Sequence, residues 1–130
     1  MNKKRIIIWT LGILLFAFLT RGLFFEKEMS CAIANETYDI IQDLEVRVDN
    51  KVVFKDSIWA ASIPCCGFRE KLDFGFHKII ITSESKKISK EFRILAFNNF
   101  HTYIGIWENK ETGEMSIKTK NYYFYRPMYL

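Results

Sequence analysis

Residues 44–55 carry the sequence LEVRVDNKVVFK, in which apolar and charged side chains alternate one by one over positions 44–49. Alternation with a period of two is typical of a strand that buries one face. Asp49 and Asn50 tolerate turn conformations, and the apolar residues that follow them resume the strand. The stretch therefore predicts a β-hairpin.

Similar patterns continue to the end of the chain. Further strands are predicted at residues 79–81, 88–94, 102–107, 115–119 and 122–125. About seven or eight short strands at spacings of roughly 8 to 12 residues are typical of a sandwich. The expected fold class is all-β, an antiparallel immunoglobulin-like β-sandwich of about 7–8 strands at residues 36–130, after one N-terminal transmembrane helix.

An apolar segment at residues 6–25 precedes this domain. A helix of this length, at roughly 1.5 Å per residue, spans a hydrocarbon core of approximately 30 Å. Trp9 lies near one membrane interface, and Arg21 lies near enough to the other for its long side chain to reach the headgroups. We therefore expect residues 6–25 to be a transmembrane helix or signal anchor, with the lipid bilayer as its partner.

The formal charge of +4 is unevenly distributed along the chain. Residues 1–30 carry five basic and two acidic groups, whereas residues 31–130 carry fourteen and thirteen. The basic tip at residues 1–5 predicts a cytoplasmic N-terminus, so the domain would lie outside the cytoplasm. The charged and small residues at 26–35 suggest a linker, and the near-neutral domain beyond it argues against nucleic acid as a partner.

Two other interpretations of the N-terminal segment stay open. Thr20 and Gly22 are small enough for cleavage of a signal peptide after Gly22, although Arg21 lies between them. Acylation of Cys31 would make the chain a lipoprotein, but the residues before it do not include the apolar residue expected there. All three interpretations place the domain outside the cytoplasm.

Residues 44–95 contain two short motifs, VDNK at residues 48–51 and GFH at residues 75–77, the second opening an isoleucine-rich strand. On these motifs the segment resembles the PEGA and related immunoglobulin-like modules of bacterial envelope proteins. The proline after the first hairpin and the Gly-Tyr after the second are not present in this chain. The resemblance implies a sandwich fold and an accessory role in the cell envelope, with no catalytic residue.

The chain has three cysteines, Cys31, Cys65 and Cys66. In an oxidising compartment a disulfide between Cys31 and one of the other two would close a loop of about 35 residues. Three buried free thiols are the alternative, and a bond between the adjacent pair would form a strained ring. The spacing does not match a Cys-x-x-Cys metal motif, so we expect no metal and no cofactor.

Few residues suggest catalysis. His77 and His101 lie outside any recognisable nucleophile or carboxylate motif. Polar residues near the loop around Pro64 are Ser57, Ser62, Glu70 and Asp73. The sequence contains no phosphate-binding glycine loop and no zinc-protease motif, so we expect no enzymatic activity.

Aromatic residues are the most unusual feature of the domain. The candidate binding residues are Trp59, Tyr122, Tyr123 and Tyr125. Strand alternation would send Tyr122 to one face and the other two tyrosines to the opposite face, where an exposed pair would suit an envelope protein, a glycan or a lipid headgroup. Alternatively, the inward tyrosine completes the core and the outward tyrosines cover a neighbouring strand.

Three functions follow from these observations. The first is a single-pass inner-membrane protein that displays a non-catalytic binding domain in the cell envelope. The second is a secreted soluble β domain released by signal cleavage. The third is a small envelope enzyme that uses His77 or His101.

Overall fold

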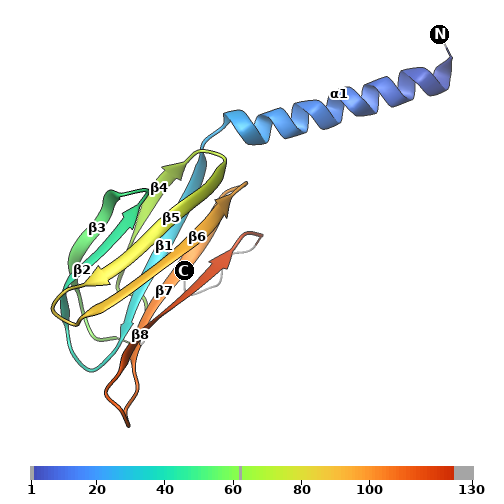
Figure 1. Ribbon diagram of the computed structural model, residues 1–130. Coiled ribbons are helices and arrows are strands. Elements are labelled where there is room, and N and C mark those ends of the chain that lie inside the picture. Colours follow the sequence, from blue (N-terminus) through green and yellow to red (C-terminus); the bar gives the residue numbers. More distant parts are fainter. Residues whose placement is uncertain (1, 62, 125–130) are drawn as a thin grey trace.

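The computed structural model describes residues 2–61 and 63–124, apart from the side chains of residues 21–24. This part of the chain forms one helix followed by eight strands (Figure 1). The elements are α1 (Lys3–Phe24), β1 (Lys27–Glu36), β2 (Ile41–Val48), β3 (Lys51–Ile58), β4 (Cys66–Leu72), β5 (Gly75–Ser83), β6 (Ile88–Ala96), β7 (Phe100–Glu108) and β8 (Met115–Tyr122).

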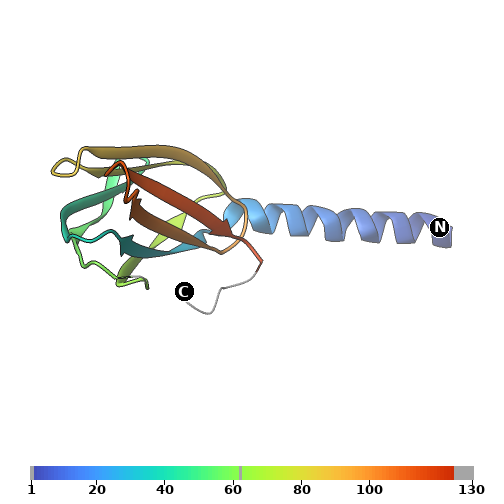
Figure 2. The same ribbon diagram turned by 90° about the horizontal axis from the view of Figure 1, so that it is seen from below.

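The strands form two four-stranded sheets, with the orders β4-β1-β7-β8 and β3-β2-β5-β6. Figures 1 and 2 show the sheets facing each other, with α1 extending away from one end of the sandwich. The predicted all-β class and strand number are confirmed. The expectation of a purely antiparallel sandwich is wrong at one pair, because β1 and β7 are parallel. The order also differs from the immunoglobulin arrangement, in which the first strand pairs with the second.

The core lies between the sheets and takes side chains from both. Its largest fully buried members include Met29, Ile33, Phe100, Ile104 and Ile106 from the first sheet and Ile41, Leu44, Val46, Ile58, Ile79, Ile81 and Ile94 from the second. From Leu44 to Val48 in β2 and from Ile79 to Ser83 in β5 the buried residues recur at every second position, which is the expected period.

The hairpin predicted at residues 44–55 is confirmed as the β2–β3 pair. Its two-residue turn consists of Asp49 (φ 49°) and Asn50 (φ 67°). Two successive positive φ angles define the type I′ turn that matches the twist of paired strands, and aspartate and asparagine adopt these angles more readily than most residues. The β5–β6 and β7–β8 hairpins lie where the other alternating segments predict them.

The prediction that residues 26–35 form a linker is wrong, because β1 occupies most of that segment and lies between β4 and β7. Met29, Cys31 and Ile33 alternate into the core, whereas smaller residues between them lie against the outer face of the sheet. In the sequence this alternation is weak, because the residues between the buried ones are the small Ser30 and Ala32 and the strand begins and ends with charged residues.

The predicted final strand at residues 122–125 is also displaced. β8 already ends at Tyr122, and the chain bends at the next two residues, so that the ring of Tyr123 stacks on Phe97 with centroids 4.8 Å apart. Tyr125 lies outside the described residues. Strand alternation therefore does not extend through the aromatic end of the chain.

The helix α1 covers most of the predicted segment 6–25 and begins earlier, at Lys3. Over the part of the chain that the structure describes, no helix has both the length and the apolar character needed to cross a membrane. The side chain of Arg21, expected near an interface, lies outside the described residues.

Candidate interaction surfaces

The alternating strand directions divide the connections between two ends of the sandwich. The proximal end, next to α1, contains residues 49–50, 73–74, 97–99 and 123–124. The distal end contains residues 37–40, 59–61, 63–65, 84–87 and 109–114. Each candidate residue that the structure describes can be assigned to one of these ends or to the sheets between them.

His77 lies near the start of β5, at the proximal end, and ties two connections together. Its Nδ1 lies 2.5 Å from Oδ2 of Asp49 in the β2–β3 turn. Its Nε2 lies 2.7 Å from the carbonyl oxygen of Asp73 in the β4–β5 connection. Because a carbonyl only accepts and an ionised carboxylate only accepts, both ring nitrogens donate a proton in this arrangement.

The electrostatics of this pair agree with that assignment. Burial of the ring lowers the pKa of His77, but the hydrogen bonds to Asp49 and Asp73 outweigh burial, so the net pKa lies above its usual value. Desolvation raises the pKa of Asp49, but the hydrogen bonds from His77 and from the backbone N–H of Lys78 bring it below its usual value. With both nitrogens donating, His77 fixes the proximal connections and has no free lone pair for use as a general base.

The other polar candidates do not converge on one site. His101 lies in β7, and its Nδ1 is buried without a hydrogen-bond partner among the described residues. Glu70 lies in β4, where it forms an ion pair of 3.0 Å with Lys51. Ser57 is near the end of β3, and Ser62 lies outside the described residues. Each candidate that is described therefore belongs to a different element.

Cys31 and Cys66 lie in two paired strands of the first sheet, and Cys65 directly precedes the second of these strands. Cys31 is buried in β1, and burial raises the pKa of its thiol. Cys66 begins β4, and burial, followed by its contact with Cys65, raises the pKa of its thiol to about 12. Both of these thiols are protonated at neutral pH and are poor nucleophiles as a result.

All three cysteines are free thiols in the structure. Cys31 is paired with Phe68, and Cys66 with Ile33, so the two cysteines are diagonal neighbours rather than partners. Diagonal positions lie roughly 7 to 8 Å apart, beyond the usual span of a disulfide. A bridge between them would require β1 and β4 to shift. Cys65 is exposed, and its Sγ lies 2.8 Å from that of Cys66.

The predicted binding aromatics do not form one surface. Tyr122 is buried and pairs with His101, which is level with Ser30 in β1. Trp59 precedes Ala60, which bridges to Asn35 at the other end of the same strand. Five strand residues, from 30 to 35, separate these levels by about 16 Å at roughly 3.3 Å per residue. The side chain of Trp59 is exposed at the distal end, whereas Tyr122 and Tyr123 are packed at the proximal end.

Two other exposed apolar side chains lie at the distal end with Trp59. Tyr38 lies in the connection after β1, and Ile63 lies in the connection after β3. The bridge between Asn35 and Ala60 brings these two connections together, and both side chains are exposed. We call Tyr38, Trp59 and Ile63 the distal patch. Buried Asn35 fixes these connections, because its Nδ2 donates to the carbonyl oxygens of Asp39 (2.7 Å) and Ile58 (3.2 Å).

A second exposed apolar set lies at the proximal end, and its members were not among the candidate binding residues. Its members are Phe25, Phe74, Phe76 and Phe124. We call these four residues the proximal collar. For Phe76 a signal was present in the sequence: it lies three positions before Ile79 and so falls on the opposite face of the same strand.

Among the described residues, no three histidine, cysteine or acidic side chains are grouped so that they could hold a metal ion. No protein-family model matches this chain, and no curated protein matches it. The interpretation of function therefore depends on the surfaces described above.

Proposed function

We propose that this chain is a membrane-anchored protein of the bacterial cell envelope, whose β-sandwich is a non-catalytic interaction domain outside the cytoplasm. The surface of α1 is the observation that carries the proposal. Its large apolar side chains are between 44% and 76% exposed: Ile6, Ile7, Ile8, Trp9, Leu11, Ile13, Leu14, Leu15, Phe16, Phe18 and Leu19. Such a helix needs an apolar environment on every side, which a lipid bilayer supplies.

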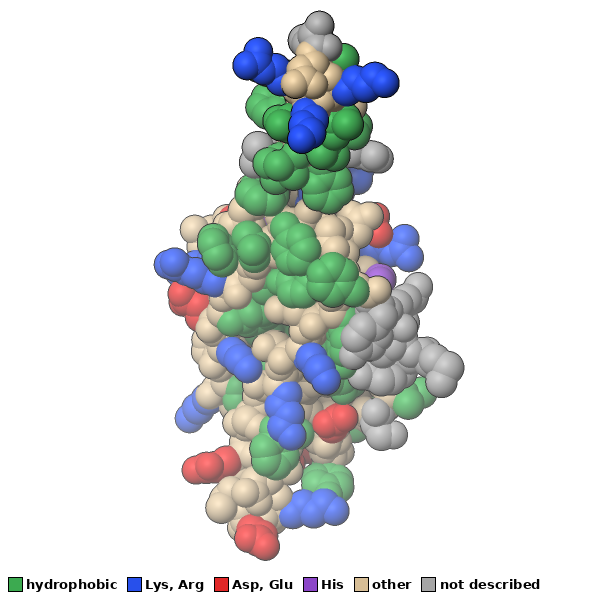
Figure 3. Space-filling view, turned by 90° about the vertical axis from the view of Figure 1, so that its right-hand side faces the viewer, with side chains coloured by type: hydrophobic (Ala, Val, Ile, Leu, Met, Phe, Trp, Pro, Cys, Tyr) green, Lys and Arg blue, Asp and Glu red, His purple; other side chains and the backbone are tan. Residues whose placement is uncertain are grey.

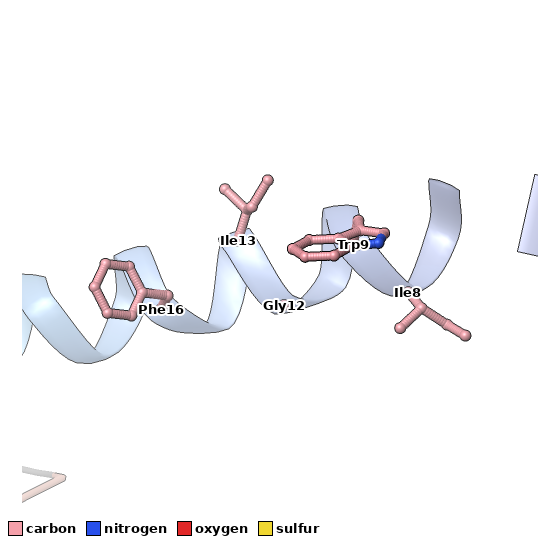
Figure 4. Close-up of a pocket in the computed structure, with 5 residues that line it drawn as sticks. All are labelled: Ile8, Trp9, Gly12, Ile13 and Phe16. Atoms are coloured by element: carbon pink, nitrogen blue, oxygen red, sulfur yellow. The ribbon is translucent and has the colours of Figure 1, made fainter. Parts of the chain in front are cut away.

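The arrangement of these side chains agrees with a lipid environment. Figure 4 shows Ile8 and Ile13 extending to opposite sides of the helix. Gly12 leaves a shallow groove between Trp9 and Phe16, and that groove is lined only by residues of α1. No single apolar stripe that would pack on the sandwich can be distinguished, which favours lipid over the domain as the partner of this helix.

Taken over the whole sequence of residues 6–25, including residues 21–24 whose side chains are not described, the length and charge of the segment support a span with a defined orientation. From Ile6 to Phe25 the chain has twenty residues with Arg21 as the only charge. The nineteen of these residues that lie in α1, from Ile6 to Phe24, cover about 28 Å at roughly 1.5 Å each, close to the thickness of the hydrocarbon core. Lys3, Lys4 and Arg5 precede this stretch and favour a cytoplasmic N-terminus.

The binding role rests on the distal patch and on the resemblance to envelope modules. Trp59 is 68% exposed, and aromatic side chains are enriched where proteins bind other proteins or glycans. Of the predicted binding residues with described side chains, Trp59 is the most exposed, so we assign binding to the distal end. The engagement of both nitrogens of His77 supports an accessory rather than a catalytic role.

Extraction of membranes at alkaline pH tests the anchor. We expect the full chain to stay with the lipid, because alkali removes peripheral proteins but not spanning helices. A variant carrying Leu14→Asp and Leu15→Asp should be released, since each aspartate costs on the order of 3 kcal/mol at the centre of a span. Leu14→Ile is the matched control and should remain in the membrane. Release of the unchanged chain would refute the anchor.

Labelling of Cys65 tests the orientation, because this thiol is exposed in the structure. A membrane-impermeant maleimide should react in intact spheroplasts, and the variant Cys65→Ser/Cys66→Ser should not. Reaction only after the membrane is opened would place the domain in the cytoplasm. The mass of the mature chain separates the anchored form, which retains Met1, from a secreted form that begins after Gly22.

A further inference from the structure

The proximal collar surrounds the point where the chain enters the sandwich. Phe25 lies two residues before Lys27, the first residue of β1, and Lys27 pairs with Leu72 at the end of β4. The β4–β5 connection therefore lies at the same level, and it presents Phe74 and then Phe76. The fourth member, Phe124, follows the end of β8 at this end of the sandwich.

All four side chains of the collar are uncovered. Their exposed fractions are 63% for Phe25, 44% for Phe74, 74% for Phe76 and 86% for Phe124. Figure 3 shows hydrophobic side chains gathered on the domain directly below the helix. Large exposed apolar groups gathered at one end of a domain mark a contact surface.

The connection between α1 and β1 is too short to hold the domain away from a bilayer. Only Phe25 and Glu26 separate the end of α1 from the start of β1. Three peptide steps of at most about 3.6 Å reach roughly 11 Å. The polar zone of a bilayer leaflet is about 5 to 8 Å thick, so a domain tethered this closely lies at its surface.

His77 gives the collar a fixed shape. Phe74 follows Asp73, whose carbonyl oxygen accepts a hydrogen bond from His77, and Phe76 directly precedes His77. The same imidazole holds the β2–β3 turn through Asp49. The collar on this side is thus part of a cross-linked group of connections rather than a loose loop, which lowers the entropy lost when it enters an interface.

We propose that the proximal collar inserts into the boundary between headgroups and acyl chains of the leaflet from which the domain emerges. The domain is then docked on the membrane and directs the distal patch away from it. This inference rests on the membrane anchor proposed above. Apolar side chains of surface-bound proteins reach about 5 to 10 Å into this boundary, which suits phenylalanine rings next to the end of a span.

The charges around the collar point to apolar rather than ionic attachment. Near the collar, Lys51 is paired with Glu70, Lys78 with Glu91, and Asp49 with His77. Lys27 and Lys71 lie beside Phe25 together with the acidic residues Glu26 and Glu28. Because basic and acidic groups are mixed around the collar, they are not a one-sided basic patch of the kind that attracts anionic lipid. We therefore expect docking to be insensitive to the choice of zwitterionic or anionic lipid.

Photocrosslinking of the full chain in phosphatidylcholine vesicles tests the proposal. The amino acid p-benzoylphenylalanine is placed at Phe76 in one variant, at Trp59 in a second and at Phe16 in a third. All three positions are exposed, so the bulkier ring displaces no packed neighbour. We expect lipid adducts at positions 16 and 76 and none above background at position 59.

The three positions separate the two proposals. Adducts at position 16 without adducts at position 76 would overturn docking and leave the anchor intact. No adduct at position 16 would overturn the anchor and docking together. Adducts of equal yield at positions 59 and 76 would show a domain that tumbles on the surface, which also contradicts a fixed collar. The adduct at position 76 should persist at about 1 M salt, where the screening length falls to about 3 Å.

Discussion

Replacement of Ile33 by alanine tests whether β1 is a central part of the domain. Ile33 is fully buried, and its neighbours in register are Cys66 on one side and Ile104 on the other. The substitution removes three buried carbons, worth about 2.4 kcal/mol at roughly 0.8 kcal/mol each. The cavity left between the two sheets adds to this cost, and buried isoleucine-to-alanine changes lie at about 2 to 5 kcal/mol.

We therefore expect Ile33→Ala to lower the free energy of unfolding by about 3 kcal/mol. For a domain of this size, each kcal/mol lowers the melting temperature by about 4 to 8 °C, so the midpoint should fall by roughly 12 to 24 °C. The assay is urea and thermal unfolding of the full chain in detergent micelles, followed by far-ultraviolet circular dichroism. Ile33→Val should cost only about 0.5 to 1.5 kcal/mol and serves if the alanine variant does not fold.

Glu28→Ala is the matched control in the same strand. Its side chain is 46% exposed and has an ion pair of 3.9 Å with Arg69, so its loss should change stability by about 0.5 kcal/mol or less. If Ile33→Ala were as neutral as Glu28→Ala, residues 26–35 would not be a core strand. The reasoning that replaces the predicted linker by β1 would then fail.

Two other substitutions probe contacts at single residues. Gly67→Ala should destabilise the domain by about 1 to 3 kcal/mol in the same unfolding assay, because an added Cβ would lie 2.1 Å from the backbone oxygen of Cys31. The control is Gly12→Ala, whose Cβ meets nothing within 4 Å and which should leave stability unchanged. Equal effects of the two substitutions would exclude the clash as the cause. His77→Gln should remove a pH dependence of stability. Because the pKa of His77 is higher in the folded than in the unfolded chain, its protonation stabilises the folded domain. This contribution is fully present below the unfolded pKa of about 6.5 and is lost as the pH rises through the folded pKa. We expect on the order of 1 kcal/mol after allowing for the half-exposed Asp49, and identical urea midpoints against pH for both proteins would contradict the role of His77.

Strands were predictable where alternation and a local turn occur together. The β2–β3 hairpin combines three buried positions at every second residue with an Asp-Asn turn, and both signals lie within twelve residues. The β5–β6 pair is similar, with Ile79 and Ile81 as its strongest members. Such pairs are specified by neighbouring residues, and a sequence pattern is most reliable for them.

β1 and β4 were not predictable in the same way. The partners of β1 are distant in the chain, since Met29 pairs with Glu70 and with Phe100. Neither the β1–β4 pair nor the β1–β7 pair is joined by a short turn that could be recognised in the sequence. In β4 the inward-facing set includes Glu70, which is satisfied by Lys51 rather than by apolar packing. A charged residue at a core-facing position breaks the apolar alternation by which a strand is recognised.

The candidate surfaces depend on how distant segments meet. Trp59 was named as a candidate binding residue from the sequence, yet its position at the distal end depends on the bridge between Ala60 and Asn35, which lies far earlier in the chain. The turn of the chain after Tyr122 likewise places Tyr123 on Phe97, so strand parity no longer tells which aromatic is exposed. Parity holds only while the strand continues.

Strand parity and a two-layer architecture together distinguish core phenylalanines from those that serve a surface. A sandwich of two sheets has one interior, so each strand can bury only one of its two faces. In β5 that face belongs to Ile79 and Ile81, which leaves Phe76 outside whatever the rest of the sequence contains. A large aromatic side chain on the outer face then has either a partner or an apolar medium to meet. Phe76 lies at the end of the sandwich from which α1 extends, and the apolar side chains of α1 are exposed as well. One apolar medium next to both groups would account for their exposure, which is the reason for the membrane docking that we propose.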